Sequence, residues 1–158
     1  MPLFINRTLV ENDSWQQVDE ESLTQGGDII VPLPLYQAHL ATLQSREGQV
    51  AIQIEGDVDI NWLLAHAEQF PLITIHFPVL RDGRGFSIAR LLRRAGFSGE
   101  IRALGDVSQD RLDFMTRCGF DALEIPTERF SPEVANAFDE FSVRYQGAAD
   151  HSRPVYHQ

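Results

Sequence analysis

The feature that most constrains the fold is a repeating alternation of short apolar runs and helical stripes that begins near residue 50. Val50–Ile54 has the continuous apolar character of a buried strand, and Ile60, Leu63, Leu64 and Ala67 then recur at the spacing of one helix face. Strands and helices that alternate in this way form right-handed crossovers and a mostly parallel sheet. The later predicted strands are 72–77, 100–104 and 121–125, and the later helical stripes run from Ile88 to Ala95, from Asp106 to Cys118 and from Ser131 to Phe141.

This pattern predicts a single α/β domain whose mostly parallel open sheet has about four to six strands and is covered by helices. Four repeating units are too few to close an eight-stranded barrel within one chain. A half-barrel that pairs with another copy of the chain is the alternative architecture. A short N-terminal β arm or hairpin is expected over residues 1–34, the α/β core over 35–146 with a first helix at 35–46, and a flexible tail over 147–158.

The composition limits the partners and the compartment. The formal net charge of −10 argues against general nucleic-acid binding and against docking on anionic lipid, since both need a basic surface. The single cysteine, Cys118, is typical of a reducing compartment, and no run approaches the roughly 20 apolar residues of a membrane span. The N-terminal sequence also lacks the apolar segment of a signal peptide. We therefore expect a cytoplasmic protein with no membrane or nucleic-acid partner.

Ligand binding is expected where the parallel strands end, and the most informative segment there is Arg81–Ser87. Its glycines allow backbone N–H groups to converge at a helix start, and Arg84 and Arg90 could donate paired hydrogen bonds to a carboxylate, phosphate, sulfite or sulfate. The alternative is a tight turn in which Arg84 pairs with a neighbouring acid. The segment has neither the ending of a P-loop nor a complete dinucleotide fingerprint, so no cofactor is assigned. The candidate ligand-binding residues are Arg81, Asp82, Gly83, Arg84, Gly85, Ser87, Arg90 and Asp106.

Three further residues, His76, Asp110 and Arg117, are secondary candidates. His76 ends a buried strand, where it could be a general base or a core histidine with its hydrogen bonds satisfied. Asp106 and Asp110 lie one turn apart at a helix start, where they could serve acid/base chemistry, bind magnesium or cap the helix. Cys118 is expected to be a buried, unreactive thiol. No histidine pair has metal-ligand spacing and one cysteine cannot hold an iron–sulfur cluster, so no metal site is predicted, and the catalytic residues are left unassigned.

Three segments in order, Asp82–Leu92, Gly99–Val107 and Arg117–Asp121, resemble a bacterial family, the domain-of-unknown-function family nine-three-four. The likeness extends from about Ile29 to Tyr145. Members of that family are typically encoded beside the sulfite reductase haemoprotein, and the family is described as an oxidoreductase of sulfite reduction. The resemblance therefore implies a role in assimilatory sulfur metabolism with sulfite reductase as a partner, and it brings no catalytic residues with it.

Three functions remain open at this point. The first is an accessory protein or oxidoreductase that acts with sulfite reductase, although electron transfer would need a bound flavin or nicotinamide and no motif for either is present. The second is a small enzyme or binding domain that recognises an oxyanion or a phosphorylated ligand at the Arg84 loop. The third is a non-catalytic interaction domain, which predicts an exposed apolar patch and no concave pocket at the strand ends. A homodimer is expected from the general frequency of such assemblies.

Overall fold

The computed structural model describes residues 1–79, 81–150, 153–154 and 156, and within these ranges eight strands form one sheet. The strands are β1 (Leu3–Ile5), β2 (Thr8–Val10), β3 (Trp15–Gln17), β4 (Asp28–Pro32), β5 (Val50–Ile54), β6 (Leu72–Phe77), β7 (Glu100–Gly105) and β8 (Ala122–Glu124). Their spatial order is β2-β1-β8-β7-β6-β5-β4-β3. Neighbours from β3 to β8 are parallel, whereas β1 is antiparallel to both β8 and β2. The sheet is therefore mixed but mostly parallel.

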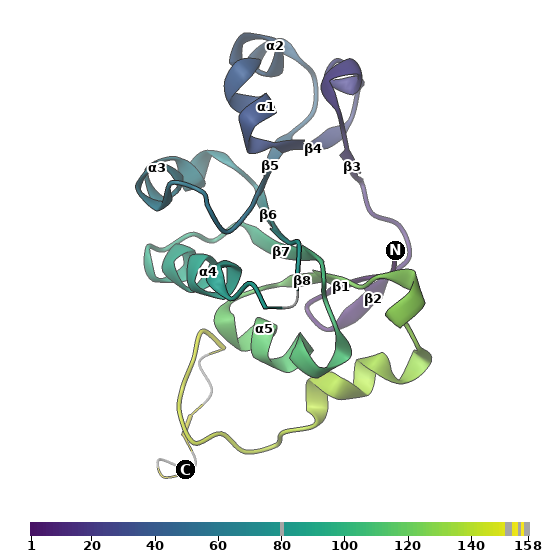
Figure 1. Ribbon diagram of the computed structural model, residues 1–158, viewed down its shortest axis with the longest axis vertical. Coiled ribbons are helices and arrows are strands. Elements are labelled where there is room, and N and C mark those ends of the chain that lie inside the picture. Colours follow the sequence, from purple (N-terminus) through teal and green to yellow (C-terminus); the bar gives the residue numbers. More distant parts are fainter. Residues whose placement is uncertain (80, 151–152, 155, 157–158) are drawn as a thin grey trace.

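The sheet curls into a half-barrel with helices on its convex side (Figure 1). The helices are α1 (Leu33–Ala38), α2 (Leu40–Ser45), α3 (Ile60–His66), α4 (Arg84–Arg94) and α5 (Leu112–Cys118), and the described residues also include 3₁₀ segments, the longest of which is Pro132–Asp139. Because β3 to β8 lie side by side in chain order, crossovers of the usual right hand place their connections on the same face of the sheet. The twist between neighbouring strands accumulates over the sheet and curls it. The chain that joins β2 to β3 runs along the opposite, concave side.

The predicted strand number of four to six was too low, and the sheet has the half-barrel curvature that the sequence left as the alternative. The two strands that the pattern missed, β2 and β3, have three residues each, which is too short to show a period. The β1–β2 hairpin turns at Asn6 and Arg7, whose φ angles of 49° and 67° are those of a tight two-residue hairpin loop. β4 continues the parallel sheet, with Ile29 opposite Val50 and Val31 opposite Ile52.

The main core lies between the convex face of the sheet and the helices. Alternate strand residues such as Ile73 and Ile75 pack there with Ile88 and Leu92 of α4. The 35–46 helix of the sequence interpretation is divided at His39 into α1 and α2. None of the helices in the described ranges has the length and apolar character needed to span a membrane.

The concave face buries a charge. Thr74 of β6 and Arg102 of β7 are cross-strand neighbours on this face, and both are almost completely buried. Arg102 Nε donates to Glu100 at 2.9 Å, and its Nη1 donates at 2.5 Å to Asp13, which belongs to the connection between β2 and β3. Burial opposes the charged guanidinium, but these two carboxylates outweigh it and raise the pKa of Arg102. The N-terminal connection is thus tied across the half-barrel to a central strand.

Candidate functional site

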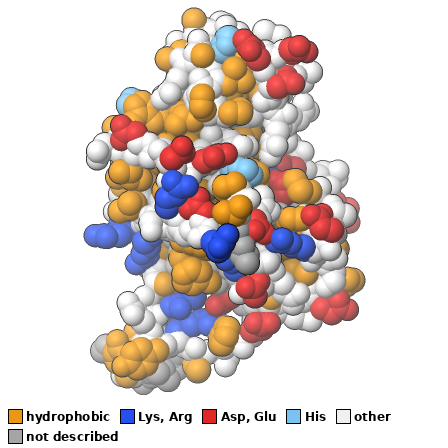
Figure 2. Space-filling model, viewed as in Figure 1, with side chains coloured by type: hydrophobic (Ala, Val, Ile, Leu, Met, Phe, Trp, Pro, Cys, Tyr) orange, Lys and Arg blue, Asp and Glu red, His pale blue; other side chains and the backbone are white. Residues whose placement is uncertain are grey.

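The loops after the parallel strands form one rim of the half-barrel, where acidic and basic side chains alternate (Figure 2). Ligand sites of barrels and of open α/β sheets lie at this end of the strands. The rim contains the loop after β6 and most of the candidate residues. It also contains residues from the loops after β5, β7 and β8 that the sequence interpretation did not select.

Asp82 and Arg84 form a closed local ion pair in the loop after β6. The Asp82 carboxylate accepts hydrogen bonds from the Arg84 backbone N–H at 3.1 Å, from Nε at 2.9 Å and from Nη2 at 2.8 Å. These bonds lower the pKa of Asp82 to about 2 and raise the pKa of Arg84. Gly56 leaves room for the Arg84 side chain, because a Cβ at residue 56 would lie 2.7 Å from Arg84 Nε. An anion that bound Arg84 would have to compete with Asp82.

His76 and Glu55 form a second pair on the same rim. His76 Nδ1 lies 3.1 Å from Glu55 Oε1, and the imidazole is more buried than the carboxylate. Gly105 packs against the ring, since a Cβ there would lie 2.7 Å from His76 Cδ2, and its φ of 93° also favours glycine. A carboxylate on one ring nitrogen fixes the tautomer and orientation of the imidazole. The pair can therefore hold the other nitrogen ready for proton transfer.

Glu55 is a site residue that the sequence interpretation did not include among its candidates. The strand register could have indicated it, because Gln53 lies opposite Thr74 on one face and the next residues on that face are Glu55 and His76. However, the pairing register of β5 with β6 cannot be read from the sequence of either strand alone.

Asp106 pairs with Arg129 at the next position along the rim. The expectation that Asp106 caps the following helix was wrong, since the residue before the 3₁₀ turn Gln109–Arg111 is Ser108 and α5 begins only at Leu112. Asp110 accepts a hydrogen bond from the Ser108 hydroxyl at 2.5 Å. Asp106 thus joins two loops of the rim instead of serving its own helix.

The remaining candidates have different surroundings. Arg81 and Ser87 are exposed, and Gly85 is buried against the Phe77 ring. Arg90 lies farther along α4, and Arg117 binds Asp150 and the backbone oxygen of Gln146. The structure therefore places Arg84 and Asp106 on the rim, but it places Arg90 and Arg117 beside the C-terminal segment.

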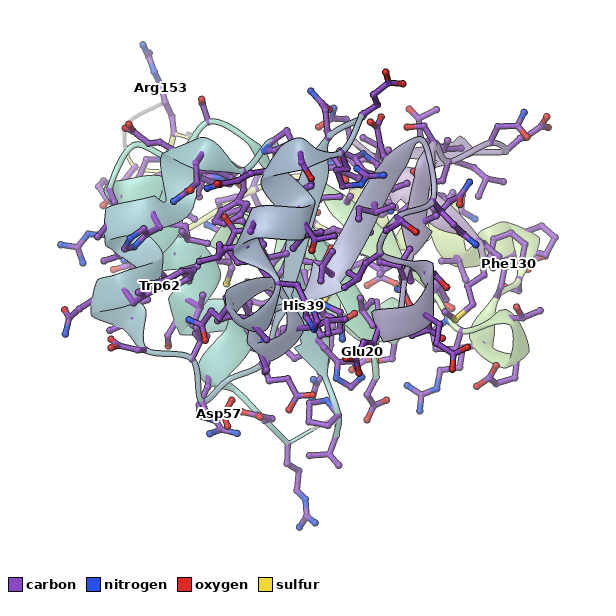
Figure 3. All side chains as sticks on the ribbon, turned by 90° about the horizontal axis from the view of Figure 1, so that it is seen from above. Glu20, His39, Asp57, Trp62, Phe130 and Arg153 are labelled. Atoms are coloured by element: carbon purple, nitrogen blue, oxygen red, sulfur yellow. The ribbon has the colours of Figure 1, made fainter. Side chains whose placement is uncertain are left out.

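A groove of about 380 Å³ opens on the rim beside the ends of β4 and β5. Its lining residues are Pro32, Leu33, Pro34, Gln37, Gln53, Ile54, Glu55, Asp57 and Val58. Figure 3 shows Asp57 projecting at the edge of the molecule, well away from Trp62 and His39. Glu55 belongs both to this groove and to the pair with His76, so the groove is the part of the rim where a small ligand could meet the imidazole pair.

Metal and thiol chemistry find little support in the side chains present. Within the described ranges, no three histidine, cysteine or carboxylate side chains gather closely enough to hold a metal ion. Cys118 is only partly exposed, and burial raises the pKa of its thiol, with a smaller opposing effect from Arg90 and Arg117. The thiol is therefore protonated at neutral pH and is a weak nucleophile.

Comparison with known proteins assigns a family without an activity. No curated protein matches the chain. The model of one family, described as bacterial protein of unknown function (DUF934), matches residues 51–156, from β5 through the described C-terminal segment. The match covers two thirds of the chain and all the rim loops after β5 to β8. The chain belongs to the DUF934 family of bacterial proteins of unknown function.

Proposed function

We propose that the chain is an accessory protein of sulfite reduction that works by binding sulfite reductase. The resemblance found in the sequence supports the choice of partner. The pairing of Arg84 with Asp82 and of Arg129 with Asp106 supports a binding role over anion chemistry at these arginines, since each cation already has a carboxylate. The raised pKa of Cys118 is unfavourable for thiol-based electron transfer.

The observation that carries this proposal is an exposed aromatic surface on the C-terminal segment. Phe141, Tyr145 and Tyr156 are 62%, 81% and 61% exposed, and Val143 is also exposed. The rings of Tyr145 and Tyr156 meet edge to face at 5.7 Å. Large aromatic side chains that remain in water are the usual energetic centres of protein interfaces. We call these four residues the aromatic surface.

Two ion pairs hold residues 144–150, which include Tyr145 of the aromatic surface. Arg144 donates to Asp113 of α5 at 2.5 Å, and Arg117 of α5 binds Asp150 at 3.2 Å. Residues 144–150 are therefore fastened to α5 at both ends. A partner would meet the Tyr145 ring on a backbone that is already positioned, which lowers the entropy lost on binding.

Co-purification at physiological salt tests the proposal. Wild-type protein is expected to retain the sulfite reductase haemoprotein, and F141S/Y145S is expected to bind it at least about tenfold more weakly, as for loss of one interface anchor. L9S/L40S is the matched control, because it removes two exposed apolar side chains from other surfaces. No retention by the wild type, together with unchanged sulfite reduction in a deletion strain, would contradict the proposal.

A second candidate function, supported by the His76–Glu55 pair, is binding and proton transfer on a small ligand at the rim. Its test is thermal unfolding of wild type, Arg84→Ala and His76→Gln with sulfite, sulfate, phosphate, flavin and nicotinamide. Loss of a ligand-dependent shift in Arg84→Ala would indicate an oxyanion or phosphate at Arg84. Loss only in His76→Gln would place the ligand at the imidazole pair. The absence of any shift in the wild type would count against this function.

A further inference from the structure

A second surface lies beside the aromatic one, in the groove between α4 and residues 146–150. The groove has a volume of about 500 Å³ and is lined by Arg90, Arg93, Arg94, Gly96, Phe97, Ala148 and Ala149. Its outer wall is fixed, since the Ala149 N–H donates to the Arg117 backbone oxygen at 3.0 Å. The small side chains of Ala148 and Ala149 and the bare Gly96 leave room along its floor.

The three arginines of this groove have different tasks. Arg93 is structural, because it donates to the backbone oxygens of Phe97, Gly99 and Gly119 and to the Asp121 carboxylate. Arg90 and Arg94 are exposed, and neither has a hydrogen bond or an ion pair within the described part of the chain.

Two acids beside the groove are already engaged by other arginines. Asp121 binds Arg93, and Asp150 binds Arg117. Arg90 and Arg94 also lie one helical turn apart, so their like charges repel each other. The dipole at the end of α4 favours a cation at Arg94 but acts much less on Arg90. The contacts within the fold therefore do not explain why both Arg90 and Arg94 place a positive charge on this groove.

We infer that this groove is where a partner docks an acidic segment, with its carboxylates on Arg90 and Arg94. The inference rests on the proposed function and names the partner's chemistry. A formal net charge of −10 repels acidic molecules from most of the surface, so a basic groove selects where such a segment can approach. The same net charge and the small number of free arginines disfavour a nucleic acid, which needs many phosphate contacts. In Figure 2, basic side chains lie on the left side of the molecule, and an apolar patch lies below them at the lower left.

The test uses two variants of equal net charge. R90Q/R94Q removes both positive charges from the groove, and Q16E/Q44E adds two negative charges on exposed positions of β3 and α2. Each variant is two charge units more negative than wild type, so a difference between them reports position rather than net charge. Binding is measured by fluorescence anisotropy for the sulfite reductase haemoprotein, a short glutamate-rich peptide containing one phenylalanine, and an oligothymidylate of equal charge.

Wild type is expected to bind the haemoprotein or the glutamate-rich peptide in a salt-sensitive way. R90Q/R94Q should bind at least about tenfold more weakly and Q16E/Q44E close to wild type. If R90Q/R94Q binds the haemoprotein as wild type does, the docking inference fails while the proposed function stands. If wild type binds the peptide but not the haemoprotein, the proposed function fails while the docking inference stands. Tighter binding of the oligothymidylate, or no binding of any probe, overturns the inference.

Discussion

The three hydrogen bonds that Asp82 accepts from Arg84 organise the start of α4. One of them comes from the backbone N–H of the first helical residue, so the carboxylate serves the helix as well as the guanidinium. These hydrogen bonds account for the polar character of Arg81–Gly85, and no bound ligand is needed to explain it. It also makes Asp82 the rim group with the clearest dependence on pH.

We expect Asp82→Asn to be less stable than wild type at neutral pH. The pKa of Asp82 is about 2 in the folded protein and 3.8 without its partners, so its contribution is fully present above pH 4 and is lost as pH falls towards 2. The difference in unfolding temperature between wild type and Asp82→Asn should therefore shrink over this interval. Thermal unfolding monitored by circular dichroism at several pH values measures it.

Asp57→Asn is the control for this prediction, because it removes a carboxylate from the same rim. A pH-independent difference between Asp82→Asn and wild type would contradict the assigned ion pair.

At the scale of elements, the packing of α4 on β6 depends on one glycine. A Cβ at Gly85 would lie 2.6 Å from the Phe77 ring and 3.0 Å from Ile75. Phe77 is held in turn by Phe86 and Phe120, whose ring centroids lie 5.1 and 5.9 Å away. The ring therefore has little freedom to move aside, and the helix must shift instead.

Gly85→Ala is expected to lower the free energy of unfolding by about 1–3 kcal/mol, as overpacking of a filled core does. Gly83→Ala, two residues earlier and just before α4, should change it by less than about 0.5 kcal/mol, since no atom lies within 4 Å of the added methyl group. Urea denaturation of both variants measures the contrast. Equal effects would mean that Gly85 is needed for something other than close packing.

The elements that could be predicted from sequence are those whose own residues decide them. β5 to β8, α3 and α4 follow from local period and capping, and at the start of α3 Asp59 accepts hydrogen bonds from the N–H groups of Asn61 and Trp62. The helix predicted from Ser131 begins there and buries Val134 and Phe138, but it is a 3₁₀ helix over Pro132–Asp139 and leaves Phe141 exposed. The tighter turn of a 3₁₀ helix breaks the 3.6-residue stripe on which that prediction relied.

In the candidate site too, a contact between residues close in sequence could be predicted, whereas contacts between distant residues could not. The Asp82–Arg84 pair spans two residues, and a local ion pair was one of the interpretations that the sequence offered. The pairs of Glu55 with His76 and of Asp106 with Arg129 span 21 and 23 residues, so they depend on register and on the path of a loop. The flexible tail predicted over 147–158 falls partly outside the described residues.

At the scale of the whole molecule, the half-barrel is tied across its concave face by Arg102. Its partner Asp13 is 89 residues away in the sequence, and no local sequence pattern predicts the contact between Arg102 and Asp13. The side chains of Asp13 and Glu100 remain 29% and 23% exposed, while that of Arg102 is only 2% exposed. Removal of the arginine would therefore strand two acids beside an apolar face.

Arg102→Met is expected to cost about 3 kcal/mol of unfolding free energy, the low end for breaking a buried ion pair, because both acids can regain water. Arg81→Met is the control, since Arg81 is exposed. Urea denaturation at neutral pH compares the two. If Asp13→Asn lowers the free energy of unfolding of Arg102→Met as much as it lowers that of wild type, Asp13 and Arg102 are not coupled.

The pairing of β1 with β8 has a consequence for synthesis on the ribosome. Leu3 is opposite Glu124 and Ile5 is opposite Ala122, so β1 cannot find its place until β8 has been translated. The parallel strands from β3 onward can assemble in order as they appear, each beside the one before it. The N-terminal hairpin must wait in the meantime, and its docking closes the free edge of β8 as one of the last events of folding.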